Sequence, residues 1–245
     1  MPPFTQKMSQ IRQPDGLTSE IPMPSTMLLR SRAAVAVLVI AALALTVGAA
    51  TEPTWLQTID QSLSESIRGW GEHGFFRVVT NLGSIFTALV VTIALAVLLW
   101  KRCRPMALAF PAVVIAAAAV DIALKLIVGR ERPLGTLVGT NLGSYPSGHV
   151  ITTVVLLGLL VPALWILTTN RAVLWTSIGL LAGGVTLVVL SRVNLGAHWP
   201  SDVLGSVLIG AAVLLGAEYA LASEWACNRC GGCGLHLPRD KGVEQ

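Results

Sequence analysis

Six long runs of apolar residues restrict the folds open to this sequence more than any other feature. Each run approaches the roughly 20 residues that a helix needs to cross the hydrocarbon core of a bilayer. Their apolar character is continuous rather than alternating, which excludes a transmembrane β-barrel. The sequence therefore predicts an all-α, polytopic membrane protein with six transmembrane helices, at about residues 33–50, 84–100, 106–128, 149–168, 172–190 and 201–222.

The composition agrees with a bilayer location and with a single domain. Hydrophobic residues make up 53% of the chain and charged residues only 12%, which is too few to coat a soluble globule. No linker-like gap separates the apolar runs, so one membrane domain is expected over residues 30–222. The proline-rich residues 1–29 predict a disordered tail, and residues 223–245 form a second tail after the last span.

A further helix is expected between the first two spans. Apolar side chains recur there at helical spacing, while Asp60, Glu65 and Arg68 occupy other faces. The pattern predicts an amphipathic helix that lies in the membrane interface, with an apolar face made of Trp55, Ile59, Leu63, Ile67 and Trp70.

The distribution of basic residues predicts the orientation. Lys and Arg gather before the first span and after the second, fourth and sixth spans, and loops of this kind face the cytoplasm. Both termini are therefore expected on the inner side of a plasma (inner) membrane. We assign Arg130, in an outer loop, a topological rather than a chemical role. No basic stripe is interleaved with aromatic residues, so nucleic acid is not an expected partner.

The four cysteines do not resemble the disulfide framework of a small secreted protein. All of them, Cys103 included, lie in segments expected on the cytoplasmic side, where thiols stay reduced. Zinc binding, palmitoylation and no role at all are open for the C-terminal group of Cys227, Cys230, Cys233 and His236.

Polar residues concentrate at one end of the predicted bundle. The end of the third span, the start of the fourth and the loop between the fifth and sixth all open on the outer face. Ser147 resembles a helix N-cap, which leaves the backbone N–H groups of Gly148 and His149 as an anion site. Three cations suit the oxygens of a phosphoryl group: Lys125, with Asp121 one turn earlier as its candidate support, Arg132 and Arg192.

Two histidines and a carboxylate complete this predicted site. The sixth helix is expected to begin at Pro200, which places His198 just before it and Asp202 in its first turn. Asp202 is expected to hydrogen-bond one nitrogen of His198 and leave the other free to attack phosphorus. His149 is left for proton transfer, first to the departing oxygen and then from water.

These residues resemble the signature of the type 2 phosphatidic acid phosphatase superfamily. The resemblance covers about residues 33–222 and implies a metal-free histidine phosphatase fold, shared with vanadium-dependent haloperoxidases. It implies the roles described above, without a cofactor, for a membrane enzyme that hydrolyses a lipid phosphate or diphosphate. Pro133, Pro146 and Ser191 would be supporting positions of the three motifs, which read Lys125-x6-Arg132-Pro133, Pro146-Ser147-Gly148-His149 and Ser191-Arg192-x5-His198-x3-Asp202.

The expected substrate is a long-chain polyprenyl (undecaprenyl-type) diphosphate. An outward-facing site would meet lipids of the outer leaflet. The Ala- and Val-rich spans look bacterial, and bacteria release this carrier lipid during cell-wall synthesis. Phosphatidic acid and phosphatidylglycerol phosphate are alternatives, because the motifs bind only the phosphoryl group.

A transporter is an alternative function from another class, although the charges of a transporter would lie near the midplane of the membrane. A haloperoxidase would share the residues, but six spans favour lipid esters. The sequence gives no indication of the oligomeric state.

Overall fold

The computed structural model describes residues 32–138, 142–168 and 170–221, and every regular element in these ranges is a helix. The all-α expectation is confirmed. The predicted apolar runs coincide with six of the helices to within a few residues. The elements are α2 (Arg32–Thr51), α3 (Thr54–Arg68), α4 (His73–Val79), the 3-10 helix η1 (Thr80–Gly83), α5 (Ile85–Trp100), α6 (Arg104–Val128), α7 (Gly148–Leu167), α8 (Arg171–Asn194) and α9 (Pro200–Leu221).

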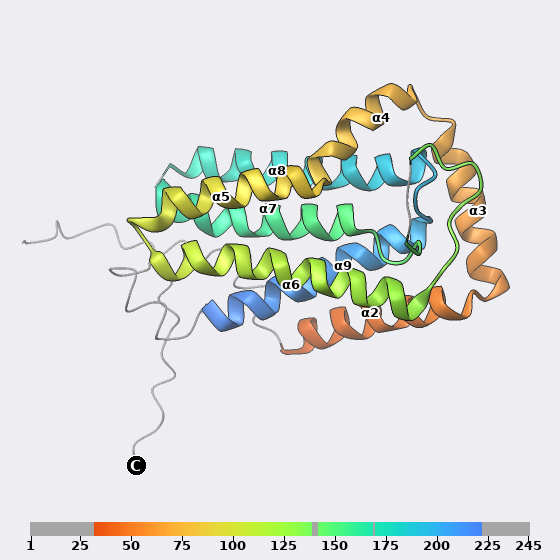
Figure 1. Ribbon diagram of the computed structural model, residues 1–245, viewed down its shortest axis with the longest axis horizontal. Coiled ribbons are helices and arrows are strands. Elements are labelled where there is room, and N and C mark those ends of the chain that lie inside the picture. Colours follow the sequence, from red (N-terminus) through yellow and green to blue (C-terminus); the bar gives the residue numbers. More distant parts are fainter. Residues whose placement is uncertain (1–31, 139–141, 169, 222–245) are drawn as a thin grey trace, which may run out of the picture.

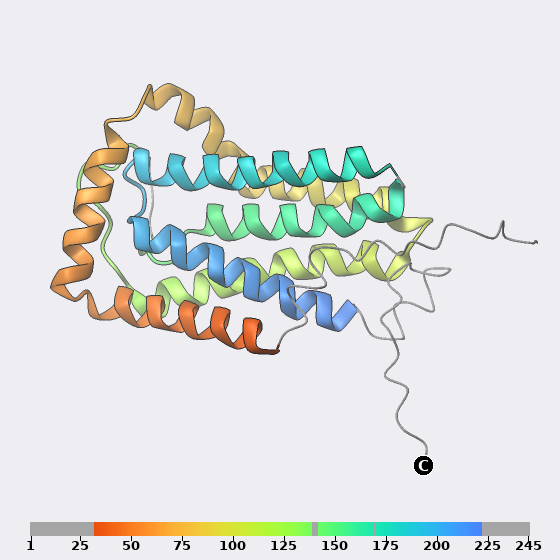
Figure 2. The ribbon, with the colours of Figure 1, turned by 180° about the vertical axis from the view of Figure 1, so that it is seen from behind.

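The long helices form a bundle around α7. This helix packs against α5, α6, α8 and α9, and α2 packs on the outside against α9 (Figure 1). Side chains such as Leu99, Phe110 and Val155 fill the interior and are almost fully buried. Seen from behind, α3 runs across one end of the bundle rather than along it (Figure 2). That end also holds the polar segments between the long helices.

Fewer helices than the sequence predicts are long and apolar enough, each by itself, to span a membrane. Three helices, α6, α8 and α9, are by themselves long and apolar enough to cross a bilayer. Two bent pairs, α2 with α3 and the α4–η1 segment with α5, raise the number to five if each pair is one span, and Gly148–Leu164 of α7 is a shorter apolar segment. The count of six therefore stays a prediction.

Helix α3 has its polar side toward the protein and its apolar side outward. It follows α2 after a bend of 95°. Asp60 is buried on its inner side, whereas Trp55, Ile59 and Leu63 are 63%, 46% and 45% exposed. This helix lies where the sequence predicts it, and its outward apolar face is of the kind that lies on lipid. Its location in a membrane interface stays a prediction.

Two features differ from expectation or lie beyond it. The loop after α3 contains α4 and η1, which the sequence pattern does not indicate because neither is long enough to show a helical period. Cys103, just before α6, is buried and disulfide-bonded, so the expectation of a reduced thiol is wrong there. The expected tails, residues 1–29 and 223–245 with the Cys227 to His236 group, lie outside the described residues.

Candidate active site

The segments expected to converge do meet, at the end of the bundle that α3 crosses. Helix α6 ends with Gly129 in the left-handed conformation, at φ 62°, which turns the chain into the loop that returns to α7. Helix α8 ends at Asn194, and Gly196, at φ 64°, reverses the chain toward α9. Pro200 begins α9, as predicted. These two chain reversals bring the polar residues into one cluster.

His198 is the centre of this cluster and is only 2% exposed. Its Nδ1 lies 2.6 Å from the backbone oxygen of Ser144, which can only accept a hydrogen bond, so Nδ1 carries the hydrogen. The lone pair is therefore on Nε2, which lies 3.3 Å from Nη1 of Arg132. This tautomer leaves Nε2 as the nucleophilic nitrogen.

The environment of His198 keeps the ring neutral. Burial lowers the pKa of His198 well below its ordinary value, and the positive charges of Arg192, Arg132 and Lys125 act in the same direction. The hydrogen bond to Ser144 opposes this shift only in part. A neutral imidazole needs no deprotonation before it attacks an electrophile.

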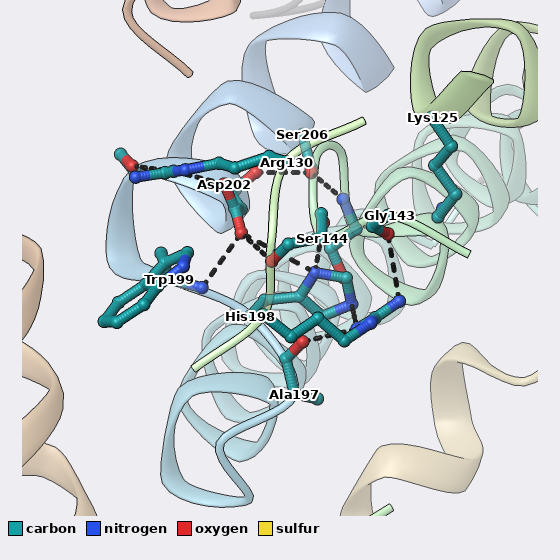
Figure 3. Close-up of polar contacts among 12 residues, drawn as sticks. Lys125, Arg130, Gly143, Ser144, Ala197, His198, Trp199, Asp202 and Ser206 are labelled. Carbon is teal, nitrogen blue, oxygen red and sulfur yellow. Dashed lines mark hydrogen bonds and ion pairs between the residues drawn. The ribbon is translucent and has the colours of Figure 1, made fainter. Parts of the chain in front are cut away.

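Asp202 does not bond to His198 as the sequence predicts. The nearest approach, between Asp202 Oδ2 and His198 Nδ1, is 3.9 Å. The carboxylate instead accepts hydrogen bonds from the Ser144 hydroxyl and from the backbone N–H of Trp199, the latter at 3.0 Å (Figure 3). It turns back to satisfy the start of its own helix. Ser144 bonds to both residues, since its hydroxyl donates to Asp202 and its backbone oxygen accepts from His198.

Arg130 is part of this cluster, and the topological role expected for it is wrong. Its side chain is almost fully buried and forms ion pairs with Asp202, at 2.6 Å, and with Asp60, at 2.8 Å. Burial alone would lower the pKa of Arg130, but the two carboxylates outweigh it and raise the pKa. A lone loop arginine gives no sign of such partners, because Asp60 lies 70 positions earlier in the chain.

Arg132 is held rigidly beside His198 by backbone oxygens. Its Nε donates to Leu142 at 3.1 Å, its Nη2 donates to Gly143 at 3.0 Å, and its Nη1 donates to Ala197. These bonds fix the plane of the guanidinium group and leave one Nη2 hydrogen unassigned. The Nη1 hydrogen that faces His198 could turn to a phosphoryl oxygen placed between them.

The other two expected cations are also fixed by single partners. Arg192 donates to the Thr80 hydroxyl at 2.9 Å, while its Nε is buried without a hydrogen-bond partner in the described chain. Lys125 is paired with Asp121, the support suggested by the sequence. All three cations act electrostatically on His198, and the same three act on His149. The structure thus gathers both histidines around one positive cluster.

The start of α7 offers further donors. Ser147 is the N-cap residue, as expected, but its side chain makes no capping bond, and its buried Oγ has no partner among the described residues. Its backbone N–H donates to Ser206 at 2.6 Å. A Cβ on Gly148 would lie 2.6 Å from Asp121 Oδ2, so the missing side chain lets α6 and α7 approach here. The anion site expected at the first N–H groups of α7 stays a prediction.

The supporting motif positions Pro133, Pro146 and Ser191 are buried. Pro133 and Pro146 lie at the two ends of the loop between α6 and α7, and the Ser191 hydroxyl donates to the backbone oxygen of Val188 within α8 at 2.7 Å.

Three residues of the site, Ser144, Thr80 and Asp60, were not predicted from the sequence. Of these, only Asp60 left a signal, as an acidic residue amid the apolar repeat of α3. Across the described ranges, no group of three or more His, Cys, Asp or Glu residues could hold a metal ion.

Comparisons with known proteins bear on the family and on the fold. Residues 106–225 match the PAP2 superfamily. The fold is similar to that of a transmembrane PAP2-type phosphatidylglycerolphosphate phosphatase from Bacillus subtilis, with a TM-score of 0.67 and 21% identity over 76% of this chain and 94% of the other. It is also similar to Aquifex aeolicus LpxE, with a TM-score of 0.52 and 19% identity over 65% and 94% of the two chains. No curated protein matches the sequence.

Proposed function

With residues 106–225 assigned to the PAP2 superfamily, we propose that this chain is an integral membrane phosphatase that hydrolyses lipid phosphates through a phosphohistidine on His198. One observation carries the proposal. A neutral, buried histidine presents a bare Nε2 beside Arg132, within a cluster of three cations that also acts on His149. Three cations and a helix N-terminus suit the charge of a pentacoordinate phosphoryl group.

The first half of the reaction forms the phosphohistidine. Nε2 of His198 attacks phosphorus while the bond from phosphorus to the leaving oxygen breaks. His149, which can hold a proton once the bound phosphate offsets the cations, gives that proton to the leaving oxygen. The hydrogen on Nδ1 of His198 stays on that nitrogen throughout, and Nδ1 keeps donating it to the carbonyl of Ser144, 2.6 Å away.

The second half regenerates the enzyme. A water molecule attacks the phosphoryl group as His149 takes one of its protons. The bond between Nε2 and phosphorus breaks, inorganic phosphate leaves, and His198 returns to its neutral tautomer. The cations lower the barrier of both halves, because the same transition-state oxygens are bound each time.

We propose that the protein supplies all the charge stabilisation itself, without a metal ion. Activity should then persist in EDTA and be inhibited by vanadate, which mimics pentacoordinate phosphorus. Loss of activity in EDTA that magnesium restores would contradict this part of the mechanism. The His198→Ala variant serves as the blank in both assays.

The position of the charges supports an enzyme over a transporter. Lys125 and Arg192 lie in the last turns of their helices, and His149 lies in the first turn of α7. A transporter of the broken-helix type would carry such charges near the midplane. Charges at helix ends, under a helix with an outward apolar face, suit a lipid headgroup at the membrane surface.

For the substrate, a long-chain polyprenyl diphosphate is our first proposal, since an outward-facing site would meet this carrier lipid. Phosphatidylglycerol phosphate is a specific second candidate, because the structure resembles a phosphatase of that lipid. The test is phosphate release from a detergent-matched panel of polyprenyl diphosphate, phosphatidylglycerol phosphate and phosphatidic acid. We expect the highest kcat/KM on the diphosphate and measurable release from phosphatidic acid. A clear preference for either glycerophospholipid would refute the first proposal and leave the histidine mechanism untouched.

The proposed orientation places the site outside a plasma (inner) membrane and both termini in the cytoplasm. Thr136, in the loop after α6, and Arg171, at the start of α8, are both exposed and lie at opposite ends of the bundle. A cysteine at position 136 should react with a membrane-impermeant thiol reagent in intact cells, beyond the labelling of the unsubstituted protein, and one at position 171 should not. The reverse pattern would overturn the orientation.

A further inference from the structure

Three charged side chains are buried together behind His198. Arg130, from the loop after α6, lies between Asp60 on α3 and Asp202 on α9, at 2.8 and 2.6 Å. Each of the three side chains is at most 1% exposed. Removing ions from water is costly unless partners compensate, so these three groups depend on one another.

The polar atoms of Asp60 are matched in detail. Its Oδ1 accepts the backbone N–H of Ser201 at 2.9 Å, and its Oδ2 accepts the Ser201 hydroxyl at 2.6 Å as well as Arg130. The Ser201 hydroxyl in turn accepts from Arg130 Nη1 at 2.8 Å. A helix that only packed on the end of the bundle would not need a buried carboxylate with all its hydrogen bonds matched. Asp60 therefore lies within the cluster rather than at its edge.

The cluster is connected to the proposed nucleophile by hydrogen bonds. Asp202 accepts from the Ser144 hydroxyl, and the Ser144 carbonyl accepts from Nδ1 of His198. A continuous path thus runs from Asp60 through Arg130, Asp202 and Ser144 to the imidazole, and Figure 3 shows its last steps.

We propose that Asp60 and Arg130 are positioning residues that act on His198 through Asp202 and Ser144. This inference rests on the proposed role of His198 as nucleophile. Arg130 alone would offset the whole charge of Asp202. Asp60 shares the guanidinium group, so the cluster keeps one net negative charge behind the ring. That charge stabilises the positive imidazole that forms as Nε2 bonds to phosphorus.

The test replaces Asp60 with Asn, a change of nearly the same shape that removes the charge and replaces one of the two accepting oxygens with an NH2 group. Glu65→Gln is the matched control, because it makes the same chemical change at an exposed position of the same helix. Vanadate titration counts folded sites and measures the affinity of the cation cluster. Single-turnover experiments measure the rate at which phosphohistidine forms.

Asp60→Asn should lower kcat and the rate of phosphohistidine formation by about 10- to 100-fold, the range known for residues that orient the ligands of a metal ion. KM and vanadate affinity should stay near the values of the Glu65→Gln control. Arg130→Lys should also lower kcat, because lysine cannot bridge two carboxylates as a guanidinium does. The kcat of the Asp60→Asn/Arg130→Lys double variant should be no lower than that of Arg130→Lys alone, since both changes interrupt the same hydrogen-bonded path to His198.

A second variant keeps the proposal testable if Asp60→Asn does not fold. Ser201→Ala removes the hydroxyl shared by Asp60 and Arg130, and it should lower kcat by a smaller factor with KM unchanged. Normal kcat in Asp60→Asn or Ser201→Ala, or a loss of vanadate affinity that matches the loss of kcat, would overturn the positioning role. A wild-type protein that forms no phosphohistidine would refute the proposed function instead.

Discussion

His198 Nδ1 donates to the backbone oxygen of Ser144 at 2.6 Å, while Asp202 approaches Nδ1 only to 3.9 Å and accepts a hydrogen bond from the hydroxyl of the same serine. Ser144→Ala removes the hydroxyl that Asp202 accepts but keeps the carbonyl that His198 needs. We expect kcat to fall by about tenfold, the loss of about one hydrogen bond to a charged group, and less than in Asp202→Asn. Ser177→Ala, on α8, is the control. Equal losses for Ser144→Ala and Asp202→Asn would contradict this arrangement.

The two histidines should be separable by chemistry. Alanine at either His149 or His198 should abolish nearly all turnover of natural substrates. With a substrate whose leaving group needs no proton, His149→Ala should still form a phosphohistidine, whereas His198→Ala should not. Labelling of the His198→Ala protein with a radioactive phosphate donor would reverse the assignment.

Acid should destabilise the folded protein through His198. The pKa of His198 lies well below 6.5 in the folded state, whereas the unfolded chain has an ordinary histidine there. Below about pH 6.5 the unfolded state therefore binds a proton that the folded state does not, and stability falls as pH falls. This histidine contributes up to about 1.4 kcal/mol per pH unit. Thermal midpoints measured from pH 7 to 5 should decline less steeply in His198→Gln, and parallel curves would contradict the prediction.

Thr80 should affect catalysis because it holds the side chain of Arg192. Thr80→Val keeps the shape of the side chain but removes the oxygen that Arg192 donates to at 2.9 Å. A bond to a charged donor is worth about 1.5 to 3 kcal/mol, so kcat/KM should fall by at least about tenfold. Thr92→Val is the matched control, since the Thr92 hydroxyl is buried without a partner among the described residues. If both variants behave alike, Thr80 does not position Arg192.

Gly148 should tolerate no side chain. A Cβ there would lie 2.6 Å from the Asp121 carboxylate, which pairs with Lys125. Gly148→Ala should push α7 from α6 at a cost of about 1 to 3 kcal/mol and lower kcat/KM. Gly179→Ala on α8, where nothing lies within 4 Å of the added carbon, should be harmless or slightly stabilising. Thermal midpoints and kcat/KM of both variants decide this.

The sequence predicted the helices well, because continuous apolar runs and helix-ending residues are local signals. Gly129 and Pro200 mark helix boundaries where they were expected. The short helix α4 was missed, since seven residues give too little periodicity to detect.

The candidate site was predicted only as far as its residue types reveal it. The cations and histidines at the span ends were expected to form one site, and the structure brings them together. The contacts of Arg130 could not be predicted, because its partner Asp60 is far away in sequence and each residue alone looks like an ordinary surface charge. Likewise, nothing in the sequence indicates that the Asp202 carboxylate turns toward Trp199 and Ser144 instead of His198.

The order of these residues along the chain also sets when the site becomes active during synthesis. The cations on α6 and α8 and the N-cap of α7 precede His198, and Asp202 opens the last described helix. Only after α9 inserts beside α7 can the carboxylate reach Ser144. On the proposed mechanism, a chain that has not yet placed α9 beside α7 lacks a complete site and cannot cleave a phosphate.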